Sequence, residues 1–289
     1  MNRTAIVTDT NSGISPMEGK ELGIFVVPMP VIIDGETYFE GTSLDHAGLY
    51  AAMHEDKDLS TSQPAIGEVT ALWDSILAQG YDDIVYIPMS SGLSSSCATA
   101  TGISDDYDGR VQVVDNHRIS VTMRHAIEDA MFLAGKGMDA AQIREELLEM
   151  AAQSVVYLGV DTLKYFKKNG RASAAAVAVA SVLNLKPILI TEGGKFEPHA
   201  KVRGLKACKE KIIEAARMEL DTRFAGVPTQ KLRIATAGTL ETGEEAEAWR
   251  SMVQESFPAF DVIYDPLSCS IACHTGIGAV GVGISQVLN

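Results

Sequence analysis

Short runs of β-favouring residues alternate with helical patterns from one end of the chain to the other. In the first half, the strand-like run 84–87 follows a segment in which Ile66, Val69 and Trp73 recur at helical spacing. From residue 155 the alternation begins again, with a strand-like run at 155–160. Strands that alternate with helices favour mostly parallel sheets that are covered by helices. We therefore predict an α/β fold with two α/β domains, each built on a mostly parallel sheet flanked by helices.

The length of the chain agrees with two domains, because 289 residues exceed the usual size of one compact domain. No linker rich in Pro, Ser or Gly marks a boundary, so we place it where the strand–helix pattern restarts. Residues 1–156 would form an N-terminal α/β domain that carries two hydroxyl-rich loops. Residues 157–289 would form a C-terminal α/β domain with an apolar helical run at 174–183 and the segment His274-Thr275-Gly276.

Acidic residues outnumber basic ones, and this balance argues against several classes of partner. The chain has 24 Lys and Arg against 38 Asp and Glu, which gives a formal net charge of −14. Such a charge repels nucleic-acid phosphates and anionic lipid surfaces. The longest apolar runs, 23–33 and 174–183, are shorter than the roughly 18 residues of a membrane helix. We therefore expect no nucleic-acid binding and no stable membrane insertion. Four cysteines are too few for a disulfide framework, which favours reduced thiols and a cytoplasmic location.

Two motifs that usually indicate cofactors do not fit their context. The segment from Gly276 to Gly281 matches the dinucleotide-binding fingerprint, but only eight residues follow it. The fingerprint works by opening a βαβ unit of about 30 residues, so we interpret this match as accidental. Cys269, Cys273 and His274 resemble a metal cluster, yet no second pair of soft ligands lies nearby in the sequence. We expect buried free thiols, no metal and no cofactor.

A serine hydrolase is one alternative that the sequence leaves open. Ser94 follows a strand and precedes a helical pattern, and Ser94, Asp265 and His274 occur in the order of the hydrolase triad. However, Ser96 replaces the second glycine of the nucleophile elbow, and no glycine-rich oxyanion segment follows an early strand. Such a nucleophile would lack donors for the developing negative charge.

Three clusters of polar residues lie at the ends of predicted strands or the starts of predicted helices. They comprise residues 60–64, 90–96 and 274–276. In open α/β sheets, ligands bind at the carboxyl ends of the strands, where hydroxyls and helix-start N–H groups can hold an anion. A small carboxylate or phosphate would fit these clusters. The alternative is that Thr61, Ser62 and Ser95 only cap helices, and that His274 is a satisfied histidine near a domain interface.

Seven short motifs, taken in order, resemble one known family over essentially the whole chain. They are Val7-Thr8-Asp9, Val27-Pro28, Thr61-Ser62-Gln63-Pro64, Ser90-Ser91-Gly92-Leu93-Ser94, Asn169-Gly170-Arg171, Lys186-Pro187 and His274-Thr275-Gly276-Ile277-Gly278. Their order and spacing are similar to those of the DegV family of bacterial fatty-acid-binding proteins. The resemblance implies a two-domain α/β protein that holds one long-chain fatty acid, of the palmitate, stearate or oleate class, in a tunnel between the domains.

The resemblance also implies a set of residues around the fatty-acid carboxylate. By motif position these are Thr61, Ser94 and His274, with the neighbouring hydroxyls Ser62, Ser95 and Thr275 as further candidates. If His274 is protonated, it would pair with the carboxylate. If it is neutral, it could donate one hydrogen bond while another group holds its second nitrogen. The apolar run 174–183 could line the tunnel, or it could be an ordinary core helix.

Family members with known roles present the bound fatty acid to a separate kinase, which forms an acyl phosphate for phospholipid synthesis. By resemblance, Arg171 and Arg203 would face this fatty acid kinase subunit. The alternative is that Arg171 supplies favourable charge at a helix C-terminus and that Arg203 is a solvated loop residue. Our interpretation is a lipid-binding carrier that performs no chemistry itself. A hydrolase of acyl esters and a binding module for a phosphorylated small molecule remain as alternatives.

Two segments depart from the family pattern. The opening motif of the family usually reads Asp-Ser-Thr/Ser-x-Asp-Leu, whereas here Asp9 is followed by Thr10-Asn11-Ser12-Gly13-Ile14. The serine loop of the family usually continues Ser-Gly-Thr-Tyr, but this chain has Ser94-Ser95-Ser96-Cys97.

Overall fold

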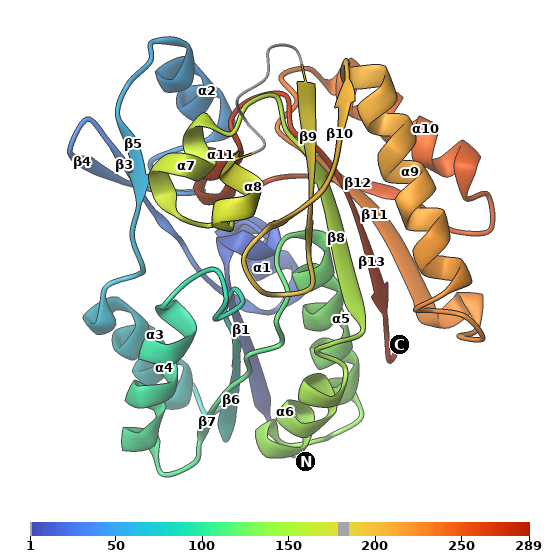
Figure 1. Ribbon diagram of the computed structural model, residues 1–289. Coiled ribbons are helices and arrows are strands. Elements are labelled where there is room, and N and C mark those ends of the chain that lie inside the picture. Colours follow the sequence, from blue (N-terminus) through green and yellow to red (C-terminus); the bar gives the residue numbers. More distant parts are fainter. Residues whose placement is uncertain (1, 179–184) are drawn as a thin grey trace.

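The computed structural model describes residues 2–178 and 185–289, and its strands form three sheets (Figure 1). The first is a four-stranded parallel sheet in the order β2-β1-β6-β7. Its strands are β1 (Thr4–Asp9), β2 (Phe25–Val27), β6 (Asp83–Ile87) and β7 (Val111–Val113). This sheet confirms the parallel arrangement that strand–helix alternation predicts for the first half of the chain.

Helices cover both faces of the parallel sheet, and its strand residues alternate between the two faces. Ala5 and Val7 pack with Trp73 on one face, whereas Ile6 packs with Met123 on the other. The first face is covered by α3 (Ile66–Ala78) and α4 (Ser96–Ser104), and the second by α5 (Val121–Gly135) and α6 (Ala140–Glu149). Two short elements follow β1, namely the 3-10 turn η1 (Thr10–Ser12) and the helix α1 (Pro16–Leu22). Another 3-10 turn, η2 (Asp105–Tyr107), follows α4.

The second sheet has six strands in the order β10-β9-β8-β13-β11-β12. They are β8 (Ser154–Gly159), β9 (Leu185–Thr191), β10 (Glu197–Arg203), β11 (Leu232–Gly238), β12 (Ile263–Pro266) and β13 (Val280–Gln286). Only the β11–β12 pair is parallel, and the other pairs are antiparallel. The expectation of a mostly parallel sheet is therefore wrong here. A short turn joins β9 to β10, which makes this pair antiparallel. Strand β13 lies between β8 and β11 and is antiparallel to both. The alternation of strands and helices therefore did not predict the direction of these strands.

The two faces of the six-stranded sheet have different neighbours. On the outer face lie α9 (Leu205–Asp221) and α10 (Gly243–Ser256), which enclose a core around Trp249. On the inner face lie the start of α5 and the short helices α7 (Lys164–Asn169), α8 (Ala174–Ala178) and α11 (Cys269–Thr275). The turn η4 (Thr229–Lys231) precedes β11. Helix α5 therefore contacts both large sheets, one at each side.

A third, small antiparallel sheet links the two large ones. It consists of β3 (Pro30–Ile33), β4 (Glu36–Phe39) and β5 (Leu59–Thr61), in the order β4-β3-β5, with α2 (His46–His54) beside it. Val31 and Leu49 of this unit pack against Cys269 and Ala272 of α11. Residues from the first third of the chain thus meet residues from its end, and this contact positions the site described below.

Two predictions from the sequence, the domain boundary and the apolar helix, can be located on the structure. The boundary that we placed near residue 156 falls inside β8, which belongs to the six-stranded sheet. The apolar run predicted as a helix at 174–183 is helical over Ala174–Ala178, and residues 179–183 lie outside the described residues. Within the described ranges, no helix is both long enough and apolar enough to span a bilayer.

Candidate functional site

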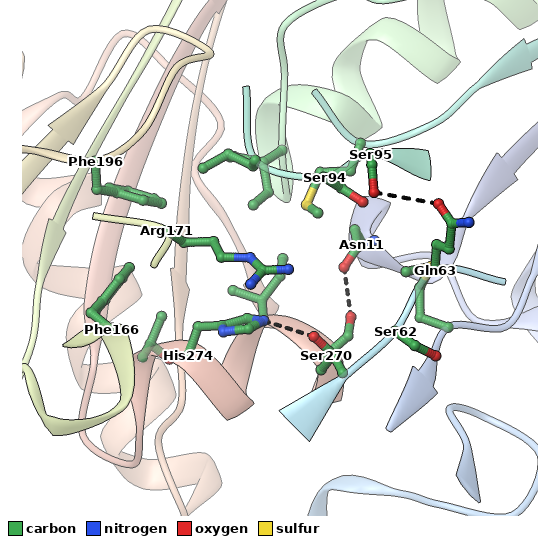
Figure 2. Close-up of a pocket in the computed structure, with 17 residues that line it drawn as sticks. Asn11, Ser62, Gln63, Ser94, Ser95, Phe166, Arg171, Phe196, Ser270 and His274 are labelled. Atoms are coloured by element: carbon green, nitrogen blue, oxygen red, sulfur yellow. Dashed lines mark hydrogen bonds between the residues drawn. The ribbon is translucent and has the colours of Figure 1, made fainter. Parts of the chain in front are cut away.

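A cavity lies where the carboxyl ends of β1, β5 and β6 approach α7 and α11 (Figure 2). Its wall has a polar part and an apolar part. The polar residues are Asn11, Thr61, Ser62, Gln63, Ser94, Ser95, Arg171, Ser270, His274 and Thr275. The apolar residues are Met29, Met89, Leu93, Ile119, Phe166, Phe196 and Ile271. Strand ends of a parallel sheet are where α/β proteins usually bind ligands, so the position agrees with the sequence expectation.

Thr61 and His274 form a hydrogen-bonded pair at this cavity, although 213 positions separate them in the chain. Thr61 Oγ1 lies 3.0 Å from His274 Nε2, while His274 Nδ1 is buried and has no partner among the described residues. Burial lowers the pKa of His274 to about 3, and the charge of Arg171 acts in the same direction. The imidazole is therefore neutral at pH 7, the second of the two states considered from the sequence.

The two arginines that resemblance assigned to one partner-facing surface lie in different places. Arg171 lines the cavity, and Figure 2 shows its guanidinium beside His274. Arg203 is exposed at the end of β10 and does not line the cavity. Among the described lining residues, Arg171 is the one with a permanent charge.

The serine loop after β6 contributes Ser94 and Ser95 to the cavity wall. Ser94 Oγ lies 3.0 Å from Ser96 Oγ and accepts a hydrogen bond from the Ser96 backbone N–H at 3.2 Å. The loop docks against the β9–β10 turn, because Ser90 Oγ donates to the carbonyl of Gly193. A Cβ atom at Gly92 would lie 2.4 Å from that same carbonyl oxygen. Only glycine at this position allows the two loops to approach so closely.

The remaining predicted hydroxyls are also at the cavity. Ser62 lines it directly after β5, and Thr275 lines it at the end of α11, where its hydroxyl donates to the carbonyl of Gly276. The structure therefore brings Thr61, Ser94 and His274 to one cavity together with all three neighbouring candidates. It also adds Asn11, Gln63 and Ser270, which sequence reasoning did not propose as site residues.

The apolar part of the wall continues into a second, smaller cavity. Ile119, Phe196 and Ile271 border both cavities. The second cavity lies against the inner face of the six-stranded sheet and is lined there by Val156, Leu158 and Val282, among others. Phe166 and Phe196, both in the wall of the first cavity, pack edge to face with ring centroids 5.4 Å apart. The site thus has convergent polar groups at one end and hydrocarbon surfaces beyond them.

The described residues do not form the serine-hydrolase triad that the order Ser94, Asp265, His274 suggested. Asp265 pairs with Arg124 Nε at 2.8 Å, His274 Nε2 contacts Thr61, and Ser94 contacts Ser96. No described hydrogen bond joins Ser94 to His274 or His274 to Asp265. Without a base and an orienting acid within hydrogen-bond reach, Ser94 lacks the activation that a nucleophile requires.

The possible metal donors that the structure brings together share only Cys269 with those considered from the sequence. Within the described ranges, Glu40, His46 and Cys269 place one potential ligand atom each within 4.8 Å of one another. The Glu40 carboxylate already accepts hydrogen bonds from the Cys269 backbone and from Thr10 Oγ1. Burial raises the pKa of the Cys269 thiol well above its usual value, so it is protonated rather than a thiolate. We assign no metal to this group.

The fold and the cavity define an α/β protein with an amphipathic binding cavity between its sheets. The chain belongs to the DegV family: the family model, described as "uncharacterised protein, DegV family", matches residues 3–287. A DegV domain-containing protein of Listeria innocua is 30% identical over 284 residues, which cover 97% of each chain. The resemblance found in the motifs is thereby confirmed.

Solved structures agree in fold over the whole chain. A Thermus thermophilus structure, described as fatty acid binding of a DegV family protein, has a TM-score of 0.87 and 26% identity. It covers 99% of this chain and 100% of its own. DegV of Bacillus subtilis, described as a fatty acid binding protein, has a TM-score of 0.84 and 27% identity, with the same two coverages.

Proposed function

We propose that this protein binds one long-chain fatty acid in the cavity, with the carboxylate at the polar end and the tail along the apolar wall. The observation that supports this most strongly is the joining of hydrogen-bond donors and hydrocarbon surfaces in a single cavity. Two relatives of similar fold and more than a quarter identity are described as fatty-acid-binding. The described residues offer no assembled nucleophile, which favours a carrier over an enzyme.

The carboxylate would meet donors of three kinds. Either tautomer of His274 leaves one donor for the ligand. With the proton on Nε2, the ring donates to the Thr61 hydroxyl, and this hydroxyl donates to the carboxylate. With the proton on Nδ1, the Thr61 hydroxyl donates to Nε2, and Nδ1 donates to the carboxylate. Ser94 supplies a second hydroxyl and Arg171 the positive charge. A single positive charge balances a carboxylate better than a doubly charged phosphate, which favours a fatty acid over a phosphorylated small molecule.

The tail would supply most of the binding free energy. Each buried CH₂ group contributes about 0.8 kcal/mol, so a tail of about 14 methylenes gives roughly 11 kcal/mol before the entropy loss. The head-group contacts must then offset the desolvation of the carboxylate and fix its position. Specificity for the acid therefore depends on the polar end of the cavity, and affinity depends on the apolar end.

The tail requires side chains to move apart. The first cavity has a volume of about 60 Å³ and the second about 20 Å³. Both are smaller than the roughly 150 Å³ of an engineered cavity that binds benzene. Ile119, Phe196 and Ile271 separate the two volumes, so they are the side chains that a long tail would displace.

We further propose that the protein is a cytoplasmic carrier that presents its fatty acid to a kinase subunit, for acyl phosphate formation and phospholipid synthesis. The support is the exposed Arg203 on β10 and the family resemblance. Charge reversal in Arg203→Glu should lower acyl phosphate formation by the kinase without changing fatty-acid affinity. Kinase activity equal to that of the wild type would contradict this surface. Arg171 lines the cavity and is a less selective probe.

The first experiment is native mass spectrometry of the freshly purified protein, followed by organic extraction and lipid identification. We expect a non-covalent mass increase equal to one long-chain fatty acid. An empty protein that also fails to take up added palmitate would refute the fatty-acid proposal. A phosphate-containing ligand would favour a binding module for phosphorylated molecules, and labelling of Ser94 by a covalent serine probe would favour the hydrolase.

A further inference from the structure

We infer that the Asn11 side-chain amide is a specificity-determining donor, which selects an ionised carboxylate over an alcohol or amide on the same hydrocarbon chain. The inference rests on the proposed function and concerns the polar end of the same cavity. Asn11 stands where the family motif usually has Thr or Ser, so the amide is a feature of this chain.

The backbone of Asn11 is fixed at both ends of the residue. Asn11 lies in η1, directly after β1, and is 1% exposed. Its N–H donates to Asp9 Oδ1 at 2.9 Å, and its carbonyl accepts from the Ser120 N–H at 2.9 Å. Asp9 Oδ2 in turn accepts from the N–H of Met89, another residue of the cavity wall. These bonds fix the backbone position from which the Asn11 side chain projects at the cavity wall.

The contact with Ser270 determines the orientation of the amide. Ser270 Oγ lies 2.5 Å from Asn11 Oδ1 (Figure 2). This separation falls within the range of O–H···O hydrogen bonds and below that of N–H···O bonds, so the amide oxygen faces the serine. Asn11 Nδ2 is then directed elsewhere, and it is buried without a partner among the described residues. A buried donor without an acceptor is costly, and a ligand acceptor would relieve that cost.

The other groups at this end of the cavity determine the chemistry of the ligand. Thr61, paired with His274, offers a donor, and Arg171 offers only donors. An ionised carboxylate accepts hydrogen bonds at both oxygens and donates none, so it satisfies every one of these groups. An alcohol or a primary amide carries its own hydrogens toward donors and leaves some of them unpaired. The Asn11 amide thus favours the carboxylate over the alcohol and the amide, and it does so without a further buried charge.

The test compares two probes of equal chain length, palmitic acid and hexadecan-1-ol, in native mass spectrometry titrations and in competition. In Asn11→Ala, one charge-assisted hydrogen bond is lost, so the palmitate Kd should rise about tenfold. Asn11→Asp keeps the size of the side chain but replaces the donor with a carboxylate. At pH 7.5 its palmitate Kd should rise roughly 100-fold, while hexadecanol affinity stays within about threefold. Below pH 5 the protonated Asp can donate, so palmitate binding should recover.

Asn116→Asp is the matched control. Asn116 is also fully buried, with an Nδ2 that lacks a described partner, but it does not line the cavity. This control should leave the preference for acid over alcohol unchanged. Loss of fold would weaken binding of both probes equally, so the ratio of the two affinities separates specificity from stability. If Asn11→Asp does not fold, the ratio of acid to alcohol affinity is measured in Asn11→Ala and Asn11→Ser instead.

The outcomes distinguish this inference from the proposed function. A wild-type protein that does not bind palmitate refutes the proposed function, whatever the variants do. In a second outcome, the wild type binds palmitate while the ratio of acid to alcohol affinity in the Asn11 variants stays within twofold of its own. This outcome refutes the role of Asn11 and leaves the proposed function intact. A selective loss of acid binding in the Asn11 variants alone supports the inference.

Discussion

Burial determines the protonation of several side chains at and near the cavity. Desolvation raises the pKa of the fully buried Asp9 to about 6, against the lowering effect of the backbone N–H groups of Met89 and Asn11. The same effect lowers the pKa of His274 to about 3. At pH 7 His274 is therefore neutral, whereas Asp9, which does not line the cavity, stays mostly ionised. The described lining residues thus present one cation, Arg171, among neutral groups, and an incoming anion meets a wall whose one permanent charge is positive.

Replacement of His274 with Ala should weaken fixation of the head group more than burial of the tail. We expect the palmitate Kd to rise about tenfold, because the variant loses the ring and its bond to Thr61. Isothermal titration at pH 7.5 measures this change. The control is His54→Ala, because His54 is exposed and contacts Glu241 at 2.6 Å, away from the cavity. Equal affinities for wild type and His274→Ala would contradict a role of this histidine at the head group.

A second buried histidine should make the stability of the protein depend on pH. Burial lowers the pKa of His125 to about 3, and its Nδ1 contacts Ser285 Oγ at 3.1 Å. Because the folded pKa lies below the unfolded value of about 6.5, the unfolded chain binds more protons as the pH falls. The contribution of His125 is therefore complete above pH 6.5 and is lost on acidification toward pH 3.

Urea unfolding at pH 7, 6 and 5 can measure this loss. In the wild type, His125 should remove up to about 1.4 kcal/mol of unfolding free energy per pH unit below 6.5. His125→Asn should have a correspondingly smaller slope, whatever its stability at pH 7. Parallel pH profiles for the two proteins would show that His125 titrates normally in the folded state.

At the scale of elements, the sequence predicted the parallel sheet because its strands alternate with helices, and strands covered by helices on both faces are apolar throughout. The run 84–87 is one example, and it forms most of β6. The direction of the strands in the second sheet could not be predicted, because β13 pairs with β8 and β11 only after the chain has folded back. The glycines of this segment resembled a nucleotide motif, and they lead instead into a central strand.

The motifs pointed to Thr61, Ser94 and His274 because the family resemblance reports on residues that are distant in sequence, and all three line one cavity. Their role in binding a ligand stays a prediction. Asn11 was not proposed as a site residue, although the departure from the family motif at this position was visible. Its role depends on the contact with Ser270, 259 positions away. Arg171 was assigned to the kinase-facing side by motif position alone, and a residue after a helix end gives no indication of which way its side chain points.

The close contact between the serine loop and the β9–β10 turn should be sensitive to one methyl group. In Gly92→Ala, the new Cβ would lie 2.4 Å from the Gly193 carbonyl oxygen, so the loops must separate. We expect about 1–3 kcal/mol lower unfolding free energy and weaker palmitate binding, because Ser94 moves with its loop. Gly102→Ala is the matched control, since nothing lies within 4 Å of its Cβ position in helix α4.

Urea unfolding and palmitate titration of both variants check this expectation. Gly102→Ala should be as stable as the wild type or up to about 1 kcal/mol more stable, because alanine has a higher helix propensity than glycine. Unchanged stability and affinity in Gly92→Ala would show that the loops are not held together as the structure indicates.

At the scale of the whole molecule, the cavity is bounded by loops and helices next to strands of both large sheets, such as Asn11 after β1 and Phe196 before β10, and by Thr61 of the small sheet. A ligand there would contact segments connected to all three sheets and stabilise their assembly. Palmitate at 100 times its Kd should add about 2.7 kcal/mol to the unfolding free energy. For a chain of 289 residues, that corresponds to a rise in Tm of roughly 4–5 °C.

Differential scanning calorimetry with and without palmitate measures this rise. Octanoate at the same concentration is the control, because its short tail gives much less apolar burial and should shift Tm little. A Tm that does not change with palmitate would contradict binding in the cavity.

The central position of β13 has a consequence for synthesis. Because β13 lies between β8 and β11, the middle of the six-stranded sheet is translated after all its other strands. While the nascent chain still lacks this strand, β8 and β11 present unpaired edges that can pair with other chains. His274 emerges from the ribosome only shortly before β13, so a chain stalled earlier has neither a complete sheet nor a head-group site. The candidate site and the six-stranded sheet are thus completed together.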